Sequence, residues 1–83
     1  MIKGVNSVAA KAFVLIETAV GKSKEVVDAL RKLEGVDSVD FVTGLYGAIA
    51  VIEGETLTEI GDLVTGKINS VPGISRMVTC LVI

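Results

Sequence analysis

The sequence has no histidine and no tryptophan, and its 83 residues include one cysteine and one proline. Without histidine, neither a Ser-His-Asp nor a Cys-His catalytic arrangement can form. The single cysteine, Cys80, excludes an internal disulfide, and alone it does not make a Cys/His metal centre. Because Cys80 stands within an apolar segment, we expect a buried structural thiol there rather than a nucleophile. These absences predict a protein that is not an enzyme and has no metal or cofactor.

Positive charge and aromatic side chains are also scarce. Eight lysines and arginines are spread along the chain against ten aspartates and glutamates, so the net charge is −2. The aromatic residues Phe13, Phe41 and Tyr46 are too few for a base-stacking platform. Binding to nucleic acid normally needs a basic face. We therefore expect no direct contact with DNA or RNA.

Long apolar runs are missing as well. The longest, Ala12–Ile16 and Ala48–Ile52, have the length of strands, far short of the ~18 residues that a membrane-spanning helix needs. The opening Met1–Asn6 has no long apolar stretch after its charge, so we expect no signal peptide. Together with the free cysteine, this predicts a cytoplasmic protein that does not associate with membranes.

Hydrophobic residues, in contrast, make up 51% of the chain. A domain of this size buries only ~60% of the surface that its unfolded chain exposes, so its core is marginal. Neither a disulfide nor a metal is available to reinforce it. Association with further copies is the remaining way to cover the apolar surface, and we expect an oligomer.

Hydrophobic periodicity and turn residues divide the chain into six elements. The expected strands are 12–18, 36–42, 48–53 and 74–83. We expect one helix with Ser23 as its N-cap and Gly35 at its end. A second begins with the capping box Thr56–Glu59 and ends at Pro72-Gly73. The order β-α-β-β-α-β predicts an α+β, ferredoxin-like fold with a four-stranded antiparallel sheet and two helices on one face.

Two surfaces of this fold can be predicted in more detail. On the second helix, Leu57, Ile60, Val64 and Ile68 mark one face, and Gly61 falls on it, so we expect this helix to lie close to the sheet there. The two helices cover only one face of the sheet. Three strands nevertheless alternate between two apolar sets: Phe13 and Leu15 with Val14 and Ile16, Ile49 and Val51 with Ala50 and Ile52, and Cys80 and Val82 with Leu81 and Ile83. Such a face exceeds what a monomer normally exposes, and we expect two copies to pack sheet against sheet.

Residues 41–51, Phe-Val-Thr-Gly-Leu-Tyr-Gly-Ala-Ile-Ala-Val, resemble the second strand, turn and third strand of the Lrp/AsnC effector domain, called RAM. Residues 71–79, Val-Pro-Gly-Ile-Ser-Arg-Met-Val-Thr, are similar to its Pro-Gly-Val ending and last strand. By this resemblance, residues 1–11 form an N-terminal extension and residues 12–83 form a RAM domain. About eleven residues precede the first strand, too few for the helix-turn-helix domain of full regulators. The chain thus looks like a stand-alone RAM domain.

The resemblance implies a homodimer that joins into octameric or decameric rings. Small effectors, usually amino acids, would bind between dimers near the turn after the second strand. The implied ligand-binding residues are Thr43, Gly44, Leu45, Tyr46, Gly47, Ala48 and Thr79. Backbone N–H groups around Gly44 could hold a carboxylate, although turn geometry also explains Gly44 and Gly47. Tyr46 could supply a wall or a hydroxyl to the site, and its alternative role is an interface anchor. The family usually has Asp where this chain has Gly47, which puts amino-acid binding in question.

Three functions follow from these patterns. The first is an effector domain that senses an amino acid or related small molecule in transcriptional regulation, without a DNA-binding domain of its own. The second is a structural oligomerisation module that co-assembles with full-length Lrp/AsnC regulators. The third, a small enzyme with substrate-assisted chemistry, is disfavoured because polar groups do not cluster. An ACT-type amino-acid-binding domain, which has the same strand order, is the alternative family.

Overall fold

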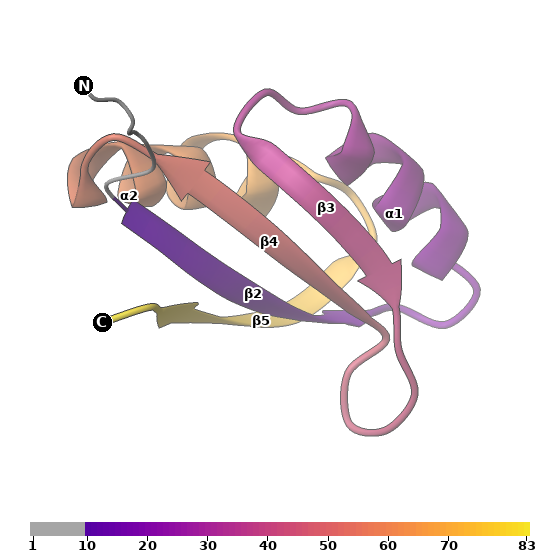
Figure 1. Ribbon diagram of the computed structural model, residues 1–83. Coiled ribbons are helices and arrows are strands. Elements are labelled where there is room, and N and C mark those ends of the chain that lie inside the picture. The colour runs from indigo at the N-terminus through magenta and orange to yellow at the C-terminus, as the bar shows by residue number, and fades with distance from the viewer. Residues whose placement is uncertain (1–9) are drawn as a thin grey trace.

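The computed structural model describes residues 10–83, and its element order is the predicted β-α-β-β-α-β (Figure 1). The first strand begins at Ala10, two residues earlier than expected, and the rest of the predicted extension lies outside the described residues. A short 3-10 turn, η1, follows the second helix. The elements are β2 (Ala10–Thr18), α1 (Ser23–Arg31), β3 (Val36–Phe41), β4 (Ala48–Gly54), α2 (Leu57–Gly66), η1 (Ile68–Ser70) and β5 (Ile74–Leu81).

The four strands form one sheet in the order β3-β4-β2-β5, and all neighbouring strands are antiparallel. Both helices lie on the same face of this sheet (Figure 1). Helix α1 packs on β3 and β4, and α2 packs mainly on β4 and β2. The edge strand β5 is therefore the least covered on the helix side. The ferredoxin-like α+β fold predicted from the sequence is confirmed.

The core lies between the helices and one face of the sheet. Alternate residues of β2 and β4 point into it, as the period of two in a strand requires. The fully buried side chains of the core are Ala12, Val14, Ile16, Val26, Val27, Leu30, Ala48, Ala50, Ile52 and Ile68. No polar or charged residue among residues 10–83 is buried, so the core has no internal polar network.

The two helix starts differ from one another. The predicted capping box of α2 is present, because the Thr56 hydroxyl accepts a hydrogen bond from the Glu59 N–H (3.1 Å). The Glu59 carboxylate reaches back to the Glu55 N–H (3.0 Å). The prediction that Ser23 is the N-cap of α1 is wrong. Lys22 holds that position, and its side chain makes no capping hydrogen bond. The Ser23 hydroxyl forms a hydrogen bond with the Thr18 hydroxyl instead.

The helix ends also differ from the sequence prediction. Helix α1 ends at Arg31, and Gly35 lies in the turn before β3, with a φ of +95°. Helix α2 ends at Gly66, well before Pro72-Gly73. Gly73 is nevertheless required there, because its φ is +98° and a Cβ would lie 3.0 Å from Val26 Cγ2. The carbonyl of Gly73 accepts a hydrogen bond from the Ala19 N–H (2.7 Å), which ties the start of β5 to the end of β2.

The predicted inner face of α2 is partly wrong. Ile60 and Leu63 are buried, whereas Leu57 is 62% exposed. Gly61 does not pack on the sheet either: it borders a hollow beside β5, and a Cβ there would meet no neighbouring atom within 4 Å. The glycine therefore does not bring the helix and the sheet together. It leaves open space beside the helix.

Candidate functional site

The face of the sheet away from the helices has an apolar centre on β2, β4 and β5. Because Val14 and its neighbours on β2 are buried beneath the helices, the alternate residues point the other way. Phe13 pairs with Val51 and Cys80, and Leu15 pairs with Ile49 and Val78. We call these six residues the open face: Phe13, Leu15, Ile49, Val51, Val78 and Cys80. The strand alternation predicted from the sequence is confirmed.

Cys80 lies on this open face, and its side chain is exposed. The prediction of a buried structural thiol is therefore wrong for the single chain. An apolar strand does not reveal which of its faces is covered, and here only the helix side is. Cys80 pairs with Phe13 in the strand register. Phe13 is 38% exposed, and its ring lies 5.5 Å from the Lys11 ammonium.

The implied ligand loop connects β3 to β4 and projects beyond the end of the sheet (Figure 1). Two hydrogen bonds hold its base: the Val42 N–H donates to the Gly47 carbonyl (3.0 Å), and the Gly47 N–H donates to the Ile16 carbonyl (2.9 Å). Gly44, at the tip, has a φ of +122°, and Leu45 beside it is 86% exposed. The loop thus has a fixed base and an exposed, uncharged tip.

The residues implied by the family resemblance lie in three environments. Thr43, Gly44 and Leu45 are exposed at the tip of the loop, Tyr46 and Gly47 are half-buried, and Ala48 is buried as the first residue of β4. Thr79 lies elsewhere, on the helix side of β5 opposite Val14. The structure therefore brings residues 43–48 together but does not bring Thr79 to them within one chain.

A pair of hydroxyl groups lies beside Gly47. Thr18 Oγ1 and Ser23 Oγ are 2.7 Å apart, and a Cβ built on Gly47 would lie 3.5 Å from the first and 3.7 Å from the second. These are ordinary contact distances, so a side chain fits at this position. The sequence prediction missed this pair, because it assigned the Ser23 hydroxyl to the helix cap.

Thr79 lines a hollow of about 260 Å³ between α2 and β5. We call this hollow the α2–β5 groove; its lining residues are Leu57, Ile60, Gly61, Val64, Thr65, Thr79 and Leu81. None of them is charged. The groove exists because α2 packs on β4 and β2 and because Gly61 places no side chain beside β5.

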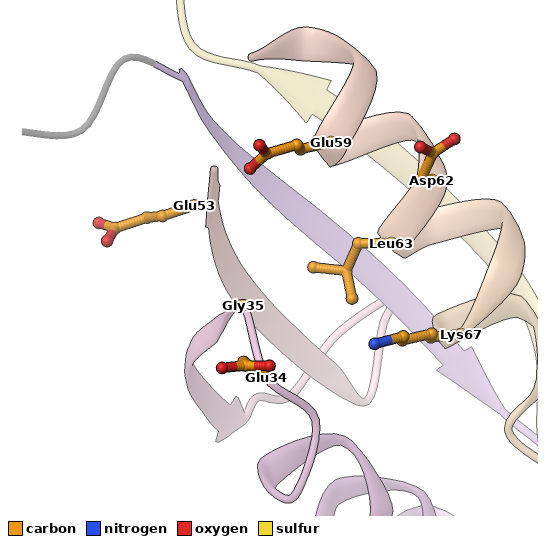
Figure 2. Close-up of a pocket in the computed structure, with 7 residues that line it drawn as sticks. All are labelled: Glu34, Gly35, Glu53, Glu59, Asp62, Leu63 and Lys67. Carbon is orange, nitrogen blue, oxygen red and sulfur yellow. The ribbon is translucent and has the colours of Figure 1, made fainter. Parts of the chain in front are cut away.

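A second hollow, of about 330 Å³, is bordered by acidic residues (Figure 2). Glu34, Glu53, Glu59 and Asp62 surround it together with Lys67. Figure 2 shows Glu53 and Asp62 on opposite sides of the hollow, and the Glu59 carboxylate already bonds the Glu55 N–H. Within residues 10–83, no group of three or more His, Cys, Asp or Glu side chains could hold a metal ion. These carboxylates therefore form no convergent site.

An ion pair on the outer surface of α1 has shifted pKa values. The Lys24 ammonium donates a hydrogen bond to Asp28 (2.9 Å), which lowers the pKa of the Asp28 carboxyl and raises the pKa of Lys24. Both side chains face solvent and lie outside the loop and the groove. Such an exposed pair on a helix is structural rather than catalytic.

Across residues 10–83, no helix has the length and apolar character needed to cross a membrane. The same residues combine an apolar sheet face, an exposed uncharged loop and no convergent catalytic groups. An apolar sheet face and an exposed loop are typical of surfaces that bind a partner or a ligand.

Comparison with known proteins gives the family. The family model described as the Lrp/AsnC ligand binding domain matches residues 11–83, and the chain belongs to this family. It is a ligand-binding domain of transcriptional regulators and not an enzyme class. The match is to this family rather than to the ACT-type alternative. Among curated proteins, no sequence matches.

Solved structures agree with this assignment. FFRP-DM1 is 34% identical, and the alignment covers 89% of this chain and 99% of that one, with a TM-score of 0.85. TTHA0845 from Thermus thermophilus is 32% identical over 89% of this chain and 92% of its own, also with a TM-score of 0.85. The transcriptional regulator NMB0573 from Neisseria meningitidis, in complex with L-Met, has a TM-score of 0.82 over 100% of this chain and 58% of its own. Its identity of 16% shows a common fold alone.

Proposed function

We propose that this chain senses an amino acid or a closely related small acid and that it works as an assembly of several copies in transcriptional regulation. The observation that carries the proposal is the tip of the β3–β4 loop. Between the two hydrogen bonds at its base, the backbone N–H groups of residues 43–46 have no acceptor among the described residues. Successive free N–H groups in a turn form a cradle for an anion such as a carboxylate.

The chemistry around the loop favours a small, largely apolar ligand. Leu45 and Tyr46 provide apolar surface beside the N–H groups, and no residue in the segment 41–52 is charged. A ligand side chain held here would meet no opposite charge from the loop. NMB0573, which has the same fold, is in complex with L-Met, and an uncharged amino acid of this kind is the ligand class that we propose.

The open face supports assembly of the chain. Burying apolar surface contributes ~25 cal/mol of stabilising free energy per Å². A domain of this size has a small core and is only marginally stable without such burial. A second copy packed against Phe13, Leu15 and Val51 would cover this surface and the Cys80 thiol. We therefore propose a dimer in which the two open faces meet, as the basic unit of the assembly.

A second function is favoured by Gly47. This position has no carboxylate to meet the ammonium group of an amino acid, and the groups beside it are the hydroxyls of Thr18 and Ser23. If the loop binds no ligand, the chain works as an oligomerisation module that co-assembles with full-length Lrp/AsnC regulators. Such regulators are proposed partners in both cases, and they would supply the contact with DNA.

A thermal-shift screen against the common amino acids and their keto acids tests the sensor. A ligand that binds the native state stabilises it, by ~2.7 kcal/mol at a concentration of one hundred times Kd, and therefore raises the unfolding midpoint. We expect an uncharged amino acid to do so, and Gly44→Ala to abolish the response, because the φ of +122° is unfavourable for alanine. Gly21→Ala is the matched control, since Gly21 also has a positive φ (+78°) and open space around it. If no compound raised the midpoint, the sensor function would be contradicted and the oligomerisation module would remain.

A further inference from the structure

The sheet holds the two ends of the β3–β4 loop unequally. At its far end the loop enters β4, which has a strand on each side, and the Gly47 N–H donates to the Ile16 carbonyl of β2 (2.9 Å). At its near end the loop leaves β3, an edge strand that pairs with β4 alone (Figure 1). The first residue after β3 is Val42, whose N–H donates to the Gly47 carbonyl (3.0 Å). The β3 end of the loop therefore has a neighbouring strand on one side only.

Arg31, the last residue of α1, contacts β3 on its other side. Its Nη2 donates a hydrogen bond to the Val39 carbonyl (2.7 Å), and its Cζ lies 5.9 Å from the centre of the Phe41 ring. Residues of an antiparallel strand alternate between bonding the neighbouring strand and pointing away from it. Because Val42 bonds toward the β4 side, the Val39 carbonyl points outward, to α1. Arg31 thus lies along the outer edge of β3 over the last three residues before the loop.

The chemistry of the guanidinium makes this a firm contact. A hydrogen bond from a charged donor is about twice as strong as one between neutral groups, and this bond is partly buried. A guanidinium near an aromatic ring adds a cation–π attraction. Both salt bridges within residues 10–83 join other side chains, Lys22 to Glu25 and Lys24 to Asp28. The guanidinium of Arg31 is therefore directed to β3 rather than to a carboxylate.

We propose that Arg31 is a positioning residue for the ligand loop: by holding Val39 and Phe41 against α1, it fixes the direction in which the chain enters residues 42–47. This inference rests on the proposed function, because it concerns the same loop. The first turn of α1 reaches the other end of the loop, where Ser23 Oγ would lie 3.7 Å from a Cβ at Gly47. One helix thus contacts both ends of the loop. The free N–H groups at its tip are held in one arrangement before a ligand binds, which lowers the cost of binding.

Hydrogen exchange of single amides, measured by NMR, tests the proposal without a ligand. Arg31→Met removes both contacts and keeps a long side chain that favours the helix. We expect the Val42 N–H to exchange roughly tenfold faster relative to the amides in the centre of β2, which open only when the whole domain unfolds. This factor corresponds to the loss of one hydrogen bond from a charged donor. The Gly47 N–H, which β2 holds, should keep its wild-type ratio to the same amides.

Two variants separate the contact from the charge. Lys32→Met removes an equal charge from the next residue, which is exposed, and it should leave the exchange of Val42 unchanged. Arg31→Lys keeps one charged donor for the Val39 carbonyl and should restore much of the slow exchange. A uniform rise in exchange across the domain would show that Arg31 only stabilises the fold. That result, or an unchanged Val42 in Arg31→Met, would overturn the proposal.

Ligand binding gives a separate measurement. With L-methionine as the probe, Arg31→Met should show a smaller rise in the unfolding midpoint than Lys32→Met, each compared with the same variant without ligand. A full response in Arg31→Met would contradict the role of Arg31. If the wild-type protein responds to no compound in the screen, the sensor function is contradicted, whereas the exchange of Val42 still decides whether Arg31 holds the loop.

Discussion

The hydroxyl groups of Thr18 and Ser23 lie 2.7 Å apart and join the end of β2 to the first turn of α1. Gly47 packs against this pair from the loop between β3 and β4. Three segments that are distant in the sequence thus meet at the base of the proposed ligand loop. A side chain at position 47 would enter this junction directly.

Gly47→Asp tests what the family aspartate contributes. We expect the variant to fold, because a Cβ has ordinary contacts at 3.5 and 3.7 Å and the hydroxyl groups can bond the new carboxylate. The added negative charge should strengthen the binding of an amino acid through its ammonium group, which a larger midpoint shift would reveal. Gly47→Ala adds the Cβ without the charge and should show no such gain. If an amino acid raised the midpoint equally in the two variants, the carboxylate would not be what strengthens binding.

The N-cap of α2 should contribute measurably to the stability of the domain. Thr56→Ala removes the hydroxyl that accepts from the Glu59 N–H, and loss of such a cap costs ~1 kcal/mol. For a domain of this size that corresponds to a fall of about 4–8 °C in the unfolding midpoint. Thr58→Ala, two residues along in the same exposed turn, should have little effect. Similar falls in the midpoint for both variants would show that the hydrogen bond of the cap does not cause the loss of stability.

The Lys24–Asp28 pair makes a small contribution that depends on pH. Because Lys24 lowers the pKa of Asp28 below its ordinary value of 3.8, the stabilisation is present above that value and is lost as the pH falls through the lowered pKa. We expect Asp28→Asn to lower the midpoint slightly at neutral pH and not at all in strong acid. Added salt should reduce the neutral-pH difference, because both groups are exposed. If the midpoints of Asp28→Asn and the wild-type protein still differed in strong acid, the ion pair would not be the cause of the difference.

Cys80 reports on whether the open face is covered. The thiol is exposed in the single chain, so an assembly through the open face should protect it from a maleimide reagent. We expect labelling to be slow in the wild-type protein and severalfold faster in Phe13→Asp, whose charge would separate the two sheets. Denatured wild-type protein gives the rate of the fully accessible thiol. Fast labelling of the assembled protein would mean that the open face is free.

Much of the fold follows from local patterns in the sequence. The alternation in β2 and β4 and the Thr56–Glu59 capping box depend on neighbouring residues, and both predictions were confirmed. The errors concern positions decided by tertiary contacts. Ser23 bonds a residue of β2 instead of its own helix, and Gly61 borders the open groove beside β5 while Leu63 is buried. Such choices depend on distant residues that a local pattern does not identify.

The candidate site was predictable only in part for the same reason. The family resemblance grouped residues 43–48, and because the loop is continuous in sequence these residues stay together in the fold. The groove combines residues of α2 with Thr79 and Leu81 of β5, and its shape depends on which strands α2 covers. The separation of Thr79 from the loop likewise follows from the strand order β3-β4-β2-β5, which places β5 at the far edge.

The mass of the particle in solution, measured by light scattering across a range of protein concentrations, tests assembly through the open face most directly. We predict a wild-type particle with the mass of a dimer or a multiple of it. Phe13→Asp should reduce that mass by at least half while the far-ultraviolet circular dichroism stays native, and Thr58→Asp, exposed on α2 and outside the open face, should not change it. A wild-type monomer at micromolar concentration, or an unchanged mass for Phe13→Asp, would contradict assembly through this face.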